Sequence, residues 1–141
     1  LPFFGHFNDS ELWEALRITN WHKYKPGVTL IKEGEIGKSF FILASGEVNV
    51  NKDRKLLNVL QAGECFGEMA YLGKVQFKRT ASIVTVADAV AIEIAADSLA
   101  QASENCRAQF ERAFLKILVE RLAAANTRLS HLLLDRKISI F

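Results

Sequence analysis

Residues 66 to 83 read Phe66-Gly67-Glu68-Met69-Ala70-Tyr71-Leu72-Gly73, then a short basic insert, then Arg79-Thr80-Ala81-Ser82-Ile83. Gly67 lets the backbone approach a ligand closely, and the residues that follow it can form one helical turn whose N–H groups face back toward that glycine. Arg79 opens an apolar, β-branched run, so its guanidinium can meet the same anion from a strand edge. The stretch therefore predicts an anion-binding site.

A cyclic monophosphate suits this site better than other nucleotides. Its phosphodiester carries one negative charge, which one arginine and one helix N-terminus can match, whereas a triphosphate would also need a lysine and a metal ion. Glu68 needs a hydrogen-bond donor, because a buried, unpaired carboxylate is costly, and a ribose 2′-hydroxyl supplies one. There is an alternative interpretation. A Gly-Glu pair or an Arg-Thr pair that occurs alone is most often part of a turn with a solvated ion pair.

The two segments together resemble the phosphate-binding cassette of the cyclic nucleotide-binding domain family. That family includes the catabolite activator protein, the regulatory subunits of protein kinase A, protein kinase G and the cyclic-nucleotide-gated channels. The resemblance implies that Glu68 accepts a hydrogen bond from the ribose and that Arg79 holds the exocyclic phosphate oxygens of cAMP or cGMP. The other residues implied at the ligand are Phe66, Gly67, Met69, Ala70, Thr80 and Ala81, with the amides of Met69, Ala70 and Ala81 completing the phosphate cradle. The resemblance implies neither a metal nor a further cofactor.

The first half of the chain extends the resemblance. The family's early strands and turns match Lys32-Glu33-Gly34-Glu35-Ile36-Gly37, Ser39-Phe40-Phe41-Ile42-Leu43 and Ser45-Gly46-Glu47-Val48. Lys38 stands where the family usually has Asp or Asn, and we expect that difference to alter a turn rather than the pocket. The implied fold is mainly β with flanking helices: an antiparallel, jelly-roll-like β-roll with an N-terminal helix, a short cassette helix and a long C-terminal helix.

The resemblance also points to residues that contact the base. By rough alignment with the long helix of the catabolite activator protein, the candidates are Asn126 and Thr127, although Asn126 is equally compatible with an exposed place on that helix. Thr80 matches a threonine of the channels and of protein kinase G whose hydroxyl can bond the 2-amino group of guanine. With Thr80 in this place the site should not discriminate against cGMP, and we expect both nucleotides to bind.

The N-terminal residues predict a helix. Asn8 is a good N-cap with Glu11 three residues later, which is the spacing of a capping box. The expected apolar face comprises Leu12, Trp13 and Leu16.

From Trp21 to Leu60 the pattern changes to short apolar runs separated by turn residues. The predicted strands cover 28–31, 40–43, 48–50 and 56–60, with the third of these alternating and the second buried on both sides. The polar stretch from Lys52 to Lys55 is expected to be a hairpin tip. Short strands at near-even spacing predict a sandwich or barrel.

The chain after Gly73 contains neither glycine nor proline. Strands are predicted at 81–86 and 89–94, followed by a short helix capped by Asp97 and a longer one capped by Asn105. The longer helix is supported by apolar residues at helical spacing between Cys106 and Leu134: Phe110, Phe114, Ile117, Leu118, Leu122, Ala125, Leu129 and Leu132. At about 40 Å it is longer than one globule needs, so we expect its second part to pair with another chain.

Composition predicts a soluble, globular protein of the cytoplasm. Of the 141 residues, 50% are hydrophobic and 24% are charged, which is close to average, and no apolar run reaches the length of a membrane span. The start lacks the basic region of a signal peptide. Cys65 and Cys106 are too few for a disulfide scaffold, so we expect buried thiols. A net charge of +2 implies neither nucleic acid nor a membrane as partner.

We expect one domain over residues 1–141: an N-terminal helical segment (1–20), the β-roll (21–95) containing the cassette (66–83), and the C-terminal helices (96–141). The first residue is Leu rather than Met, and the apolar end at Phe141 reads as if interrupted. The chain is therefore expected to be part of a longer protein that carries an effector.

Competing functional classes have weaker support. Gly37-Lys38-Ser39 resembles the end of a P-loop, but Lys32 stands where the first glycine of that motif would fall, and a strand follows. His6, His22 and His131 are too scattered for the metal site of a cupin, and no nucleophilic triad can be proposed. DNA binding would need a helix-turn-helix after the long helix. We therefore predict a regulatory sensor without catalytic activity; the alternative is the same fold acting as an interaction module that binds no nucleotide.

Overall fold

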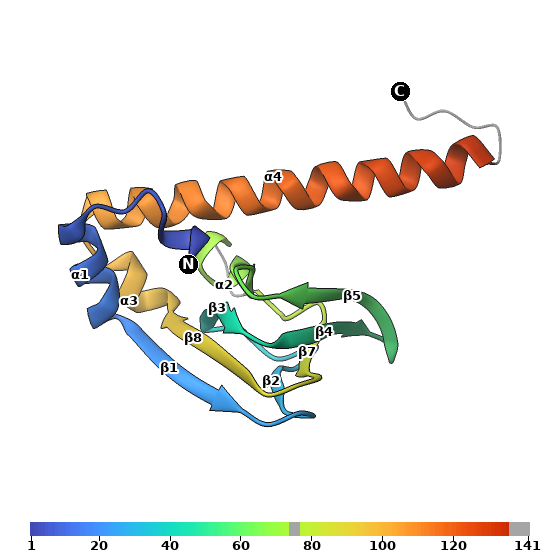
Figure 1. Cartoon of the computed structure of the whole chain (residues 1–141), viewed down its shortest axis with the longest axis horizontal. Helices are drawn as coiled ribbons and strands as arrows, with labels where there is room; N and C mark the ends of the chain where they lie inside the picture. Colours follow the sequence, from blue (N-terminus) through green and yellow to red (C-terminus); the bar gives the residue numbers. More distant parts are fainter. Residues whose placement is uncertain (74–76, 136–141) are drawn as a thin grey trace.

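Two four-stranded antiparallel sheets form the body of the protein, and one long helix lies across them (Figure 1). The structure is a computed structural model that describes residues 1–73 and 77–135. The first sheet has the order β1-β8-β3-β6, with bounds Thr19–Tyr24, Ala89–Ala95, Ser39–Ser45 and Cys65–Phe66. The second has the order β2-β7-β4-β5, with bounds Thr29–Ile31, Ser82–Thr85, Glu47–Lys52 and Lys55–Gln61. The predicted antiparallel β-roll is confirmed.

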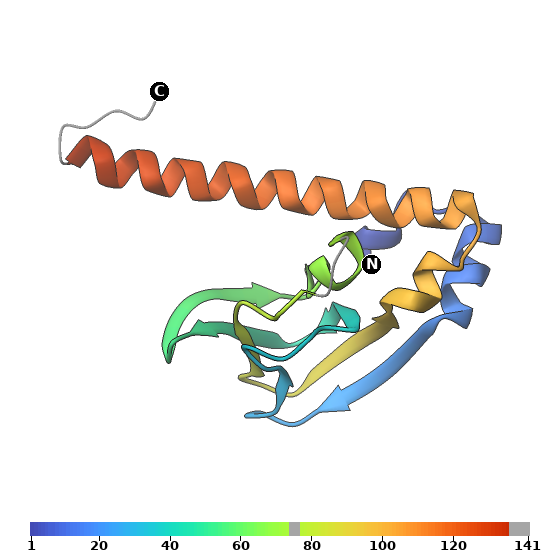
Figure 2. The same ribbon diagram turned by 180° about the vertical axis from the view of Figure 1, so that it is seen from behind.

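The helices flank this β-roll as expected. They are a short 3₁₀ turn η1 (Pro2–Phe4), α1 (Asp9–Arg17), α2 (Met69–Leu72), α3 (Ala96–Ala100) and α4 (Glu104–Asp135). In both views η1 lies beneath α4, and the C-terminal turns of α4 extend past the β4–β5 hairpin (Figure 2). Of the helices described, none combines the length and the apolar composition that crossing a bilayer requires.

Strand β3 separates two hydrophobic clusters, because successive side chains of a strand point to opposite faces. Phe40 and Ile42 pack beneath the helices, together with Phe110 and Phe114 of α4. Phe41 and Leu43 belong to the other cluster, which the second sheet lines. The expectation that this strand is buried on both sides is confirmed, and α4 is attached to the β-roll through its aromatic residues.

The N-terminal helix is capped as predicted but rotated differently. Asn8 and Glu11 form the reciprocal capping box, with both hydrogen bonds at 2.8 Å. Of the predicted apolar face, Leu12 packs against the core as expected. The prediction is wrong for the other two residues, because Trp13 is 66% exposed and Leu16 is also exposed, whereas Ala15 is only 2% exposed. Glu11 can lie on the buried face beside Ala15 because its carboxylate already accepts the Asn8 N–H.

Three boundaries differ from the expectation. β1 begins at Thr19, inside the segment assigned to the N-terminal helix; its sequence is polar and only half-buried, so it gives little hydrophobic signal. Asp97 does not cap α3, whose N-cap is Ala95. Ser103, rather than Asn105, caps α4: its hydroxyl accepts the Cys106 N–H at 3.1 Å and is itself held by Glu14 of α1. That tertiary contact is invisible in a local sequence pattern.

The two cysteines are buried thiols, as predicted. Burial raises the pKa of Cys65 to about 12 and that of Cys106 to about 11, and nearby carboxylates act in the same direction. Both thiols therefore stay protonated at neutral pH, which makes them poor nucleophiles.

Candidate functional site

The turn at Gly67 forms one wall of the site. Gly67 has φ +78°, in the left-handed region, and a Cβ there would lie 2.8 Å from Ile31 Cδ1 and 2.9 Å from Arg79 Nη1. Only glycine satisfies both the backbone conformation and the close approach. The helical turn α2 follows directly, as predicted.

Of the three backbone amides expected at the ligand, one makes a hydrogen bond within the Gly67 turn and two do not. The Ala70 N–H donates to the Gly67 carbonyl at 3.1 Å, so the expectation that it faces a ligand is not met. The reason is geometric, because a tight turn uses this amide to close itself. Within the described residues, the amides of Met69 and Ala81 have no backbone acceptor, and they stay candidates for an anion.

Glu68 is buried, with 6% of its surface exposed, and is paired to a residue that the sequence analysis missed. Arg121 of α4 donates from Nη1 to Glu68 Oε1 at 3.1 Å and from Nη2 to the Cys65 carbonyl. Arg121 lies seven residues after the buried Phe114, hence on the same face of α4, and that spacing is the signal that could have revealed it.

Arg79 faces Glu68 from the opposite segment. Its guanidinium donates to the Gly67 carbonyl at 3.0 Å and to the Ser39 carbonyl. Burial lowers the pKa of Arg79, and the nearby Glu68 carboxylate acts against that shift. An arginine nevertheless stays charged at neutral pH, so Arg79 presents a fixed cation to this site.

The turn at 34–37 holds the backbone of Arg79. The Arg79 N–H donates to the Glu35 carbonyl at 2.7 Å, and the Gly34 N–H donates to the Arg79 carbonyl at 2.8 Å. At Gly37 a Cβ would come within 2.6 Å of Arg79 Nη1, so the guanidinium passes directly over this glycine. The early turn therefore matters to the site because it positions the arginine.

Eight of the nine predicted site residues line one cavity of about 410 Å³. They are Phe66, Gly67, Glu68, Met69, Ala70, Arg79, Thr80 and Ala81. The ninth, Asn126, does not line it, and neither does Thr127. The residues of α4 that do are Arg121 and Arg128, which are seven positions apart and share one helix face.

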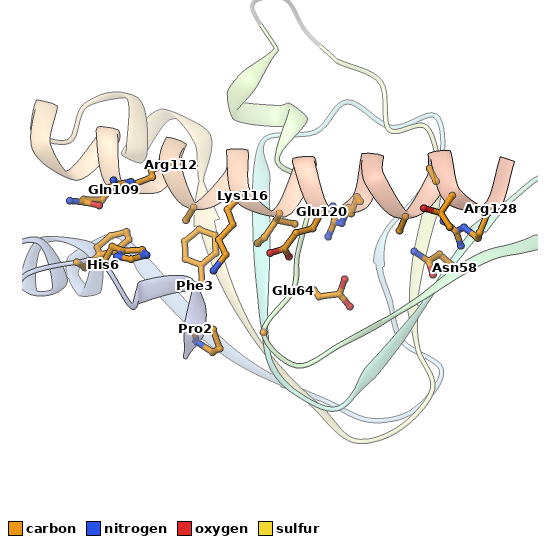
Figure 3. A pocket seen from close by; sticks show the side chains of 18 residues that line it. Pro2, Phe3, His6, Asn58, Glu64, Gln109, Arg112, Lys116, Glu120 and Arg128 are labelled. Atoms are coloured by element: carbon orange, nitrogen blue, oxygen red, sulfur yellow. The ribbon is translucent and has the colours of Figure 1, made fainter. Parts of the chain in front are cut away.

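A larger hollow of about 940 Å³ lies along α4, between this helix and η1 (Figure 3). It is lined by residues such as Phe3, Glu64 and Lys116, and it shares only Asn58, Arg121 and Arg128 with the smaller cavity. Neither Glu68 nor Arg79 lines it. We therefore place the candidate site in the smaller cavity, which holds the anion-binding groups.

Metal ligands are not gathered in the described part of the chain. Within residues 1–73 and 77–135, no three His, Cys, Asp or Glu side chains are grouped so that they could hold an ion. Arg79 and the amides of Met69 and Ala81 are candidates for an anion in this cavity, which Arg121 and Arg128 also line.

Comparison with known proteins identifies the family. The model of the cyclic nucleotide-binding domain matches residues 21–106, which is more than half of the chain. The chain therefore belongs to the cyclic nucleotide-binding domain family.

Individual relatives agree with this assignment. The chain is 41% identical over 84 residues to a cAMP-dependent protein kinase regulatory subunit of Colletotrichum orbiculare, covering 58% of this chain and 20% of that protein. It is 33% identical over 85 residues to a cGMP-dependent protein kinase of Eimeria tenella, covering 60% of this chain and 8% of that protein. The chain thus spans a fifth or less of the length of these two relatives.

A solved structure shows the same architecture over almost the whole chain. The catabolite activator protein of Thermus thermophilus superimposes with a TM-score of 0.75 at 26% identity, covering 94% of this chain and 63% of that one. The match includes the β-roll and the flanking helices, which agrees with the fold described above.

Proposed function

We propose that this domain binds a cyclic nucleotide, cAMP or cGMP, as a regulatory ligand. The observation that carries the proposal is the cavity in which Arg79 and Glu68 meet, lined by eight residues expected from the sequence. Its volume of about 410 Å³ falls within the range of small-molecule sites, roughly 300–1,000 Å³. The relatives named for cAMP and cGMP dependence support the same class of ligand.

The polar groups of the cavity suit the two ends of such a ligand. The cyclic phosphate would accept from Arg79 and from the amides of Met69 and Ala81, in place of the carbonyl contacts that Arg79 now makes. Glu68 Oε1 is taken by Arg121, while Oε2 has no hydrogen bond within the described residues and can accept from the ribose 2′-hydroxyl. Arg121 thus orients the carboxylate that meets the sugar.

The contact with the sugar gives a ligand-side prediction. The 2′-deoxy form of the preferred nucleotide is expected to bind more weakly by about 1.5–3 kcal/mol, the value of a hydrogen bond to a charged group. Glu68→Gln should reduce this difference, because a neutral amide is a weaker acceptor. Competition titrations with both ligand forms measure it, and Glu64→Gln, outside this cavity, is the matched control. Equal affinity for the ribose and deoxyribose ligands would contradict the role given to Glu68.

We propose further that occupancy acts through α4. This helix is attached to the ligand site by the Arg121–Glu68 ion pair, so a nucleotide that contacts Glu68 changes the surroundings of a residue of α4. The shift of the helix would control an effector joined to the domain or a partner chain. Residues 1–141 form one such regulatory domain in this proposal.

The exposed face of α4 favours a second copy of the chain as that partner. Leu115, Val119, Leu122 and Leu129 are all exposed. Together with Asn126 and Leu133 they follow the alternating four-and-three spacing of a coiled-coil seam, in which Val119, Asn126 and Leu133 occupy a positions. A single Asn at an a position is what specifies register in two-stranded coils, and this gives Asn126 a role outside the cavity.

A charged residue in that seam should separate the copies. We expect the chain to be a dimer in solution and Leu122→Asp to be monomeric, because a carboxylate would be buried against its own copy. Light scattering after size-exclusion chromatography measures the mass. Leu56→Asp, at an equally exposed leucine of β5, is the control and should stay dimeric. A monomeric parent chain at high micromolar concentration would overturn this part of the proposal.

The alternative function is an interaction module with the same fold that binds no nucleotide. The juxtaposition of Glu68 and Arg79 in one cavity favours the sensor, because an interaction module needs neither group there. Calorimetric titration with cAMP and cGMP distinguishes the two, since only the sensor gives saturable binding.

A further inference from the structure

One end of the nucleotide cavity is not used by the phosphate or the sugar. Arg79 and Glu68 are assigned to those groups, and the wall formed by β4, β5 and α4 also includes Val50, Leu57, Asn58, Leu60 and Arg128. The apolar members of this set can cover the faces of a flat ring. The polar members, Asn58 and Arg128, are left for its edge.

Within the described residues, no carboxylate forms an ion pair with Arg128. The ion pairs of the described residues are His22–Glu93 and Arg121–Glu68, so Arg128 takes part in neither. It follows Arg121 by two helical turns on the same face, which carries it past the sugar-binding Glu68 along the cavity. Figure 3 draws its side chain above Asn58 of β5, and the two residues line the same cavity.

Asn58 offers mainly donors. Its Oδ1 accepts the Val59 N–H at 2.8 Å, which leaves the side-chain amide N–H groups for a ligand. A guanidinium has donors only. The edge of the base would therefore meet two sets of N–H donors.

Such an edge distinguishes the two purines. Guanine presents two acceptors side by side, O6 and N7, and an arginine can donate to both. Adenine has the N7 acceptor but carries a donating amino group where guanine has O6. One N–H of the arginine would therefore face another donor and form no hydrogen bond. We infer that Arg128 and Asn58 recognise the O6/N7 edge of guanine, and that the domain prefers cGMP to cAMP. This inference rests on the proposed function, because it assigns the base within that same site.

Thr80 contacts a different edge. It lines the cavity beside Arg79, at the phosphate end, and its hydroxyl suits the 2-amino group of guanine. Inosine 3′,5′-cyclic monophosphate keeps O6 and N7 and lacks the 2-amino group. Three ligands of equal charge, cGMP, cIMP and cAMP, therefore separate the two contacts.

The experiment is a calorimetric titration of the parent chain and of three variants with these three ligands. The parent chain should bind cGMP at least about fivefold more tightly than cAMP. Arg128→Ala should weaken cGMP and cIMP each by roughly five- to tenfold and leave cAMP within about twofold. Thr80→Ala should weaken cGMP alone, by up to about tenfold. Lys116→Ala removes an equal charge from α4 outside this cavity and should change none of the affinities.

The outcomes distinguish a failure of the base assignment from a failure of cyclic nucleotide binding itself. Equal affinity of the parent chain for cGMP and cAMP, or an equal loss of all three ligands in Arg128→Ala, would overturn the base assignment and leave cyclic nucleotide binding intact. The second of those results would mean that Arg128 attracts the phosphate charge, which all three ligands share. Absence of binding by every ligand would instead contradict the proposed function itself.

Discussion

Replacing Arg79 with alanine is expected to lower cyclic nucleotide affinity by about 2–4 kcal/mol, because the phosphate loses the cation that lies against the Gly67 turn in a partly desolvated site. The guanidinium lies between the Gly67 and Ser39 carbonyls and donates to both. Arg79→Lys should show an intermediate loss, since a single ammonium keeps the charge without the two-pronged donor geometry. Calorimetry with cAMP and cGMP measures both variants.

Arg79 also joins two backbone segments, so its variants need a check on folding. Circular dichroism and thermal unfolding should show that Arg79→Lys keeps the fold. Arg17→Ala, at an exposed arginine at the end of α1, is the matched control and should bind as the parent does. If folded Arg79→Ala binds within about threefold of the parent, a difference of under 1 kcal/mol, the phosphate assignment is wrong.

Replacing Phe114 with alanine is expected to lower the free energy of unfolding by about 3–5 kcal/mol, the usual cost of truncating a buried phenylalanine. Phe114 is fully buried, and its ring centroid lies 4.9 Å from that of Phe40 on β3 and 5.6 Å from that of Phe3 on η1. It also lies 6.2 Å from the ring of Tyr71 on α2. The loss reflects both the missing contacts and the cavity left behind.

Urea titration followed by circular dichroism measures this loss. The matched control is Leu134→Ala, in the same helix but outside the proposed seam, at a leucine that is 64% exposed. Its stability should change by less than about 0.5 kcal/mol. A loss below about 1 kcal/mol in Phe114→Ala would show that the aromatic cluster does not hold α4 on the β-roll.

The cassette could be predicted from sequence because its signals are local. Gly67 occupies a left-handed turn that favours glycine, and Glu68 is a carboxylate that needs a hydrogen-bond donor. Both roles could be predicted from the neighbouring residues alone. The same holds for β3, where four consecutive apolar residues predict burial on both faces, and for the capping box at Asn8. In each case the residues that determine the structure are within a few positions of one another.

The contribution of α4 to the site could not be predicted in the same way. Its apolar residues occur on more than one face, so the sequence does not fix which face meets the β-roll. The aromatic contacts of Phe110 and Phe114 set that rotation, and they bring Arg121 and Arg128 to the cavity instead of Asn126. The prediction that Asn105 caps α4 was wrong for a similar reason, because a contact with Glu14 of α1 favours Ser103 as the cap.

The most direct test of the central claim is calorimetric titration of the parent chain with cGMP and with cAMP, alongside Arg79→Ala and Arg17→Ala. We predict saturable binding with one site per chain, retained in Arg17→Ala and lost or strongly weakened in Arg79→Ala. No saturable binding of either nucleotide up to about 1 mM, where the binding free energy is only about −4 kcal/mol, would contradict the assignment of this domain as a cyclic nucleotide sensor.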